Sequence, residues 1–119
     1  MPRAAKDFGN EVATRISEIG KFVETTEFQM LLSELRAVPV EDKVRFVENV
    51  VLNANELTRR NINIPEGMAI QRSYFADNRP TLFCVTQKLT NKQWKVTITF
   101  DNEGQPGSIP LAHPPEQGS

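Results

Sequence analysis

The chain is poor in the residues on which most catalytic and metal-binding sites depend. Its 119 residues include one cysteine, Cys84, and one histidine, His113. A single cysteine excludes an internal disulfide, and one cysteine with one histidine is too few for a zinc site. A catalytic Cys/His or Ser/His/Asp arrangement would depend on His113, which lies in a proline-rich terminus with no element to hold it.

Long apolar runs and phosphate-binding motifs are missing as well. No segment approaches the roughly 20 apolar residues that span a bilayer, and the opening MPRAAKDFGN lacks the apolar core of a secretory signal. The glycines form neither GxxxxGKS/T nor GxGxxG. These absences predict a cytoplasmic protein without a membrane partner, cofactor or metal. With no catalytic residue identifiable, they favour a protein that is not an enzyme.

Charge is nearly balanced overall but unevenly distributed. The formal net charge is −1, and 39% of the residues are hydrophobic, as in an ordinary globular domain. Residues 57–100 nevertheless carry seven basic and only two acidic side chains, while the segments on both sides are net acidic. This pattern predicts an electropositive surface or charge complementarity between parts of the chain.

The first half of the sequence has helical periodicity. Apolar residues recur at three- and four-residue steps and predict helices at about 6–24, 27–37 and 41–60. Thr26 and Gln29 have capping-box spacing, which places the second helix start near Glu27, and Pro39 ends that helix. Glu41 and Asp42 suit the positive end of the third helix dipole.

The second half alternates with the period of strands. We expect strands at about 68–76, 81–89 and 94–100, joined by short turns as an antiparallel meander. In WKVTITF one side carries Lys95, Thr97 and Thr99, which we expect to face solvent. The opposite side should meet the helices together with residues of the middle strand; this set comprises Trp94, Val96, Ile98, Phe100, Phe83 and Val85.

Helices followed by strands indicate an α+β fold, with three helices covering one face of a three-stranded sheet. Residues 1–101 would form this single domain. Residues 102–119 contain four prolines and three glycines among eighteen residues, which predicts a flexible tail.

Candidate chemical groups have ordinary structural interpretations. Cys84 lies between Phe83 and Val85, a setting typical of a buried, unreactive cysteine. Glu41, Asp42 and Glu48 could be imagined as an all-carboxylate metal site. Helix-dipole and solvated-face roles account for these carboxylates more simply.

The strongest functional signal is a group of basic, aromatic and amide residues on or beside the predicted sheet. Tyr and Arg are enriched at binding hot spots, and an unpaired edge strand can accept a strand from a partner. The candidate binding residues are Arg72, Tyr74, Gln71, Arg79, Lys88 and Lys95.

Three functions remain open from the sequence. The first is a small adaptor or regulatory domain that binds a protein partner through the basic sheet side, an edge strand or the C-terminal tail; an unpaired edge also allows a homodimer. The second is a small-ligand protein or enzyme with a pocket between helices and sheet, lined by Arg72, Tyr74, Gln71 and Cys84. The third is nucleic-acid binding by the basic 57–100 segment.

Overall fold

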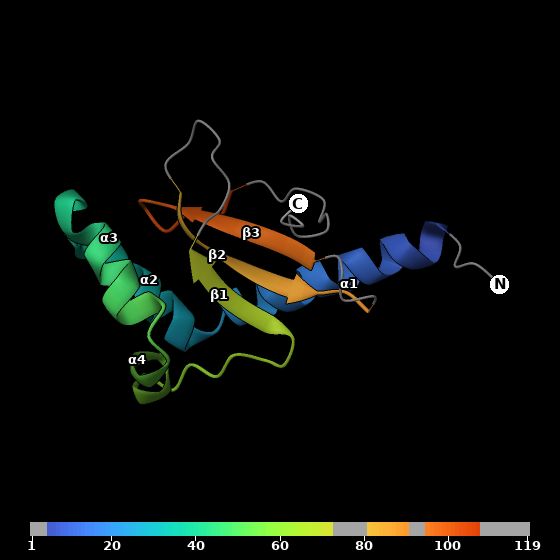
Figure 1. Cartoon of the computed structure of the whole chain (residues 1–119), viewed down its shortest axis with the longest axis horizontal. Coiled ribbons are helices and arrows are strands. Elements are labelled where there is room, and N and C mark those ends of the chain that lie inside the picture. The colour runs from blue at the N-terminus through green and yellow to red at the C-terminus, as the bar shows by residue number, and fades with distance from the viewer. Residues whose placement is uncertain (1–4, 73–80, 91–94, 108–119) are drawn as a thin grey trace, which may run out of the picture.

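The chain folds as helices followed by a three-stranded sheet (Figure 1). The computed structural model describes residues 5–72, 81–90 and 95–107. The main elements are α1 (Ala5–Val23), α2 (Thr26–Ala37), α3 (Lys43–Phe46), α4 (Ala54–Arg59), β1 (Met68–Arg72), β2 (Thr81–Lys88) and β3 (Lys95–Asp101). The sheet has the order β1-β2-β3, and both pairings are antiparallel. The predicted α+β class is confirmed.

The break between α1 and α2 is set by Thr25. Its side-chain oxygen accepts from the Phe28 N–H at 3.4 Å, and its hydroxyl donates to the Phe22 carbonyl at 2.8 Å. Gln29 Nε2 donates to the Val23 carbonyl at 2.8 Å, across the same break. The predicted capping box is therefore wrong by one residue: Thr25 is the N-cap and α2 starts at Thr26.

The third predicted helix, 41–60, is not continuous. A 3-10 turn (η1, Val40–Asp42) leads into α3, which runs into a π-helical turn (η2, Val47–Val51), and α4 follows after a break. The Asn53 side chain causes this break, because its Oδ1 accepts from the Asn55 and Glu56 N–H groups and starts a new helix. Valines in η2 are β-branched, which lowers their preference for a regular helix.

Lys43 joins α2 to α3 from a buried position. Only 4% of the residue is exposed, and its Nζ donates to the Leu35 carbonyl at 2.6 Å and the Arg36 carbonyl at 3.4 Å. Carbonyls at a helix C-terminus lack partners within the helix and carry partial negative charge, so the ammonium satisfies both needs. The turn between the helices is thereby held to α2.

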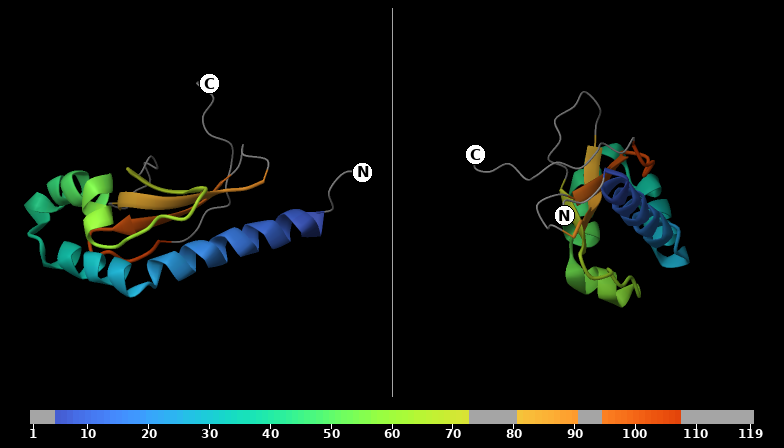
Figure 2. Two further views of the ribbon diagram at one scale, coloured as in Figure 1. Left: turned by 90° about the horizontal axis from the view of Figure 1, so that it is seen from below. Right: turned by 90° about the vertical axis from the view of Figure 1, so that its right-hand side faces the viewer.

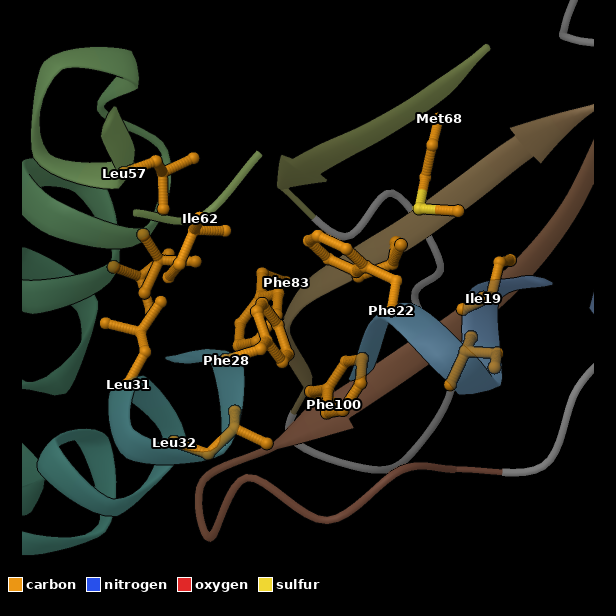
Figure 3. Close-up of a cluster of buried hydrophobic side chains, with 14 of the residues drawn as sticks. Ile19, Phe22, Phe28, Leu31, Leu32, Leu57, Ile62, Met68, Phe83 and Phe100 are labelled. Atoms are coloured by element: carbon orange, nitrogen blue, oxygen red, sulfur yellow. The ribbon is translucent and has the colours of Figure 1, made fainter. Parts of the chain in front are cut away.

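The core lies between the helices and one side of the sheet, here called the helix-facing side (Figure 2). Phe83 and Phe100 are opposite each other on β2 and β3 and stack with ring centroids 4.8 Å apart. Phe28 of α2 packs edge-on against both, and Phe22 packs on Phe28 (Figure 3). The predicted inward set is confirmed for the following buried residues: Phe83, Val85, Val96, Ile98 and Phe100. Trp94 lies outside the described residues.

Polar contacts attach α1 to the sheet as well. Gln87 of β2 is buried and donates through Nε2 to Glu18 Oε1 at 2.8 Å. Arg15 Nη1 lies 2.6 Å from the same carboxylate oxygen. Glu11, nearer the start of α1, accepts from the N–H and hydroxyl of Thr90 just after β2. These contacts set the position of α1 along the sheet.

The opposite side of the sheet, the outer side, is not solvated at its centre, contrary to prediction. Thr97 and Thr99 are 5% and 8% exposed, and their β2 neighbours Cys84 and Thr86 are also buried. Gly107 lies close against this side, since a Cβ built on it would lie 2.6 Å from Thr99 Oγ1.

The predicted tail starts too early. Residues 102–107 turn back onto β3: Asp101 Oδ1 accepts from the Glu103 and Gln105 N–H groups, and Gly104 takes a φ of +71° that suits glycine. The Gly107 N–H then donates to the Thr99 carbonyl at 2.7 Å. The expectation that residues from 102 onward cannot pack is wrong for 102–107, while 108–119 lie outside the described residues.

Candidate functional site

Of the predicted binding residues, the four that the structure describes do not share one side of the sheet. Arg72 ends β1 on the helix-facing side, where it pairs with Phe83. Gln71 projects to the outer side, opposite Cys84, and Lys88 is four residues farther along β2, about 13 Å away. Tyr74 and Arg79 lie outside the described residues.

Arg72 already has a partner from a helix. Its Nη1 is in ion-pair contact with Glu48 Oε2 of the π-helical turn, and the two side chains are 55% and 47% exposed. Exposed pairs contribute little to stability, typically below about 1 kcal/mol. The contact nevertheless places η2 beside the end of β1. The pair was not predictable from the sequence, because residues 24 positions apart show no local pattern.

Within the described part of the sheet, the basic surface of the outer side is small. Lys88 and Lys95 face each other directly across β2 and β3, Lys88 exposed and Lys95 half-buried. Like charges in this arrangement repel. The neighbouring positions on this side are the buried threonines Thr86 and Thr97. They do not extend the basic surface, which would need exposed charged residues there.

Cys84 has the properties of a structural cysteine. It is 1% exposed, and burial raises the pKa of its thiol to about 11, although the nearby positive charge of Lys95 opposes the shift. At neutral pH the thiol is therefore protonated and a poor nucleophile. Its Sγ lies 3.8 Å from the Arg72 carbonyl oxygen.

Of the residues expected to line a pocket (Arg72, Tyr74, Gln71 and Cys84), the three that the structure describes do not lie on the same side of the sheet. Arg72 is on the helix-facing side, whereas Gln71 and Cys84 are on the outer side. Between helices and sheet, aromatic side chains occupy the space where such a pocket was expected (Figure 3). Among the described residues, no three His, Cys, Asp or Glu side chains are placed to share a metal ion.

The two edges of the sheet differ in how their hydrogen-bonding groups are used. On β3, the Asp101 N–H donates to the Gln105 carbonyl, the Gly107 N–H donates to the Thr99 carbonyl, and Phe100 forms a bridge with Pro106. Residues 105–107 thus cover the second half of this edge. Covering an edge is a common way of preventing unwanted strand pairing.

On β1 the outward groups can be assigned from the hydrogen-bond pattern. The Lys88 N–H donates to the Gly67 carbonyl, so Gly67, Ala69 and Gln71 direct their backbone groups towards β2. The backbone groups of Met68 and Ile70 and the N–H of Arg72 then point away from β2, whereas the Arg72 carbonyl lies near Cys84 of β2.

Most of these outward groups have no strand beside them. The Met68 N–H donates to the Pro65 carbonyl, and the Arg72 carbonyl accepts weakly from Cys84 Sγ. Within the described residues, the N–H and carbonyl of Ile70 and the N–H of Arg72 have no hydrogen-bond partner. Figure 1 shows β1 as the outermost strand, with no described strand beyond it. We call this outward side of Met68–Arg72 the β1 edge.

Other comparisons add no further assignment. No described helix is long and apolar enough to cross a membrane. No protein-family model, curated protein or solved structure matches the chain.

Proposed function

We propose that this chain is a small protein-binding domain that takes an extended segment of a protein partner as an additional strand beside β1. The observation that carries the proposal is the β1 edge, where Ile70 presents both a donor and an acceptor without a partner among the described residues. Backbone groups of this kind are the ordinary means by which sheets bind extended peptides.

The side chains around the edge favour an extended segment with an apolar centre. Ile70 is half-buried on the helix-facing side and packs against the core cluster. An apolar side chain of the partner would lie next to it and extend this contact, since neighbouring strands place side chains about 5 Å apart. At the end of the strand, the exposed Arg72–Glu48 pair would contact polar or charged groups of the partner.

The proposal is tested by selecting binding peptides from a display library and substituting Ile70. Ile70→Pro removes the outward N–H but no β2 hydrogen bond, because proline is tolerated where a strand N–H points away from its sheet. We expect at least about tenfold weaker binding, equivalent to roughly one or two hydrogen bonds. Isothermal calorimetry measures the affinity.

The matched control is Ile70→Ala, which loses more side chain at this position but keeps the N–H. It should bind better than Ile70→Pro at equal folded fraction, as measured by circular dichroism. In ¹⁵N spectra of the wild type, peptide should slow hydrogen exchange at the Ile70 amide. Equal peptide affinities for the wild type and Ile70→Pro would contradict strand addition at this edge.

A further inference from the structure

We infer that the strand added at β1 comes from a second copy of this chain, so that two sheets join into one across a two-fold axis. This inference rests on the proposed function and names its partner. It follows from the sequence EGMAIQR, residues 66–72, considered together with the direction of each residue in the sheet.

The alternation of outward groups limits the possible registers. Two copies can pair antiparallel only if their outward residues, Met68, Ile70 and Arg72, meet in hydrogen-bonded pairs. One such register places Ala69 opposite Ala69 of the second copy. Each Met68 then lies opposite Ile70 of the other copy, and the Ile70 N–H donates to the Met68 carbonyl across the axis. The Met68 N–H already binds the Pro65 carbonyl, so each Met68–Ile70 pair makes one hydrogen bond while that contact persists and two if the Met68 N–H turns to the Ile70 carbonyl of the other copy.

Each pair in this register is chemically matched. Met68 and Ile70 are apolar and both belong to, or pack against, the core cluster on the helix-facing side. At the axis, Ala69 forms a non-hydrogen-bonded pair with its copy, the type in which Cα atoms approach to about 4.5 Å and small side chains fit. Gln71 lies opposite Gly67, where no side chain obstructs it.

The charges at the two ends of the strand are complementary as well. Glu66 precedes β1 in the turn where Gly67 has a φ of +84°; it is exposed and has no ion-pair partner among the described residues. Arg72 ends β1, contacts Glu48 and remains 55% exposed. Antiparallel pairing brings Glu66 of one copy to Arg72 of the other at both ends.

Like charges stay apart in the same arrangement. The two Arg72 residues lie six strand positions from each other, about 20 Å, which exceeds the screening length of about 8 Å at physiological salt. A strand with an acid at its start and a base at its end is therefore complementary to itself when antiparallel. This complementarity, rather than the open edge alone, favours a second copy over an unrelated peptide.

The test is sedimentation velocity of the full chain over a range of concentrations, with charge reversals at the two ends. Glu66→Arg or Arg72→Glu alone should weaken the dimer at least tenfold, since each homodimer then contains two like-charge contacts. An equimolar mixture of the two variants restores both opposite-charge contacts, and a heterodimer close to wild-type affinity should form. Glu24→Arg, an equal charge change on an exposed residue after α1, should leave the dimer unchanged.

Ile70→Pro gives an independent readout, because it removes the N–H that crosses the axis. It should abolish the dimer while Ile70→Ala keeps part of it. A dimer that survives Ile70→Pro and both charge reversals overturns the β1 pairing. A wild-type chain that stays monomeric at all concentrations also overturns the β1 pairing. In that case, selected peptides whose binding depends on the Ile70 N–H would still support the proposed function. If no such peptides are found, both the dimer and the proposed function are contradicted.

Discussion

The two edges of the sheet differ in how many of their outward backbone groups are hydrogen-bonded to other parts of the chain. Beyond β3, Asp101 organises a turn that returns Gln105–Gly107 along the strand, so that backbone groups of Thr99 and Asp101 are paired. Beside β1, the connector from α4 supplies only the Pro65 carbonyl, and Ile70 keeps its outward groups free of described partners. Residues 105–107 thus cover part of one edge, whereas the outward groups of Ile70 on the other edge have no partner within 5–72, 81–90 and 95–107.

The largest expected loss of stability comes from a substitution in β3, the strand whose edge residues 105–107 cover. Phe100 is fully buried, stacks on Phe83 and packs against Phe28. Phe100→Ala should lower the free energy of unfolding by about 3 to 5 kcal/mol, from lost burial and the cavity left behind. Urea unfolding followed by circular dichroism measures this. A loss below about 1 kcal/mol would mean that β3 is not fixed to the core as described.

The next largest effect is expected at alkaline pH, which should lower the stability of the domain through Cys84 in β2. The Cys84 pKa is raised to about 11, whereas an unfolded thiol ionises near its ordinary value of 9.0. The contribution of the buried neutral thiol is therefore present below pH 9 and is lost as pH rises from about 9 to 11, by roughly 2 to 3 kcal/mol. Comparing unfolding of the wild type and Cys84→Ala across this range isolates the effect. Parallel curves for the two proteins would contradict it.

Gly107→Ala tests the contact between residues 105–107 and the edge of β3. The added Cβ would lie 2.6 Å from Thr99 Oγ1, so either Thr99 or the returning segment has to shift. We expect a loss of about 1 to 3 kcal/mol, the usual range for overpacking. Adding Thr99→Ala should recover much of this loss, because it removes the oxygen that the Cβ meets. A double-mutant cycle with no coupling between the two sites would contradict the close approach.

The smallest stability effect is expected at the β1 edge. Ile70 is only half-buried, so Ile70→Ala should cost the isolated domain about 1 kcal/mol, less than a fully buried isoleucine. If two copies pair through β1, the loss should grow with protein concentration, since the dimer adds to apparent stability by mass action. Thermal unfolding at low and high concentration distinguishes the two cases. A concentration-independent loss of 3 kcal/mol would place Ile70 in the core instead.

Local periodicity was sufficient where one side of an element meets the core along its whole length. The alternation of Val96, Ile98 and Phe100 placed these residues correctly, and the helical steps located α1 and α2 to within a few residues. The same reasoning failed over 41–60, because Asn53 caps a new helix and the π-turn shifts the phase that a regular helix would keep.

The candidate site was only partly predictable for a different reason. An open edge strand was expected, but the sequence could not say which strand it was. Nor could it show that Arg72 pairs with Glu48, or that Gln71 and Arg72 point to opposite sides of the sheet. The buried position of Lys43 was not predicted either. Its partners are backbone carbonyls that become free to accept only where α2 ends.

The sequence by itself determined the fold class of this protein, amphipathic helices followed by alternating strands, and a composition with one cysteine and one histidine. Those properties depend on side-chain periodicity and composition, which are local. Only the tertiary structure decided that Gln105–Gly107 return to β3, that Thr97 and Thr99 are buried, and that β1 has no described strand on its outward side. These features depend on which backbone groups meet across long sequence separations, and every residue carries the same backbone donor and acceptor apart from proline.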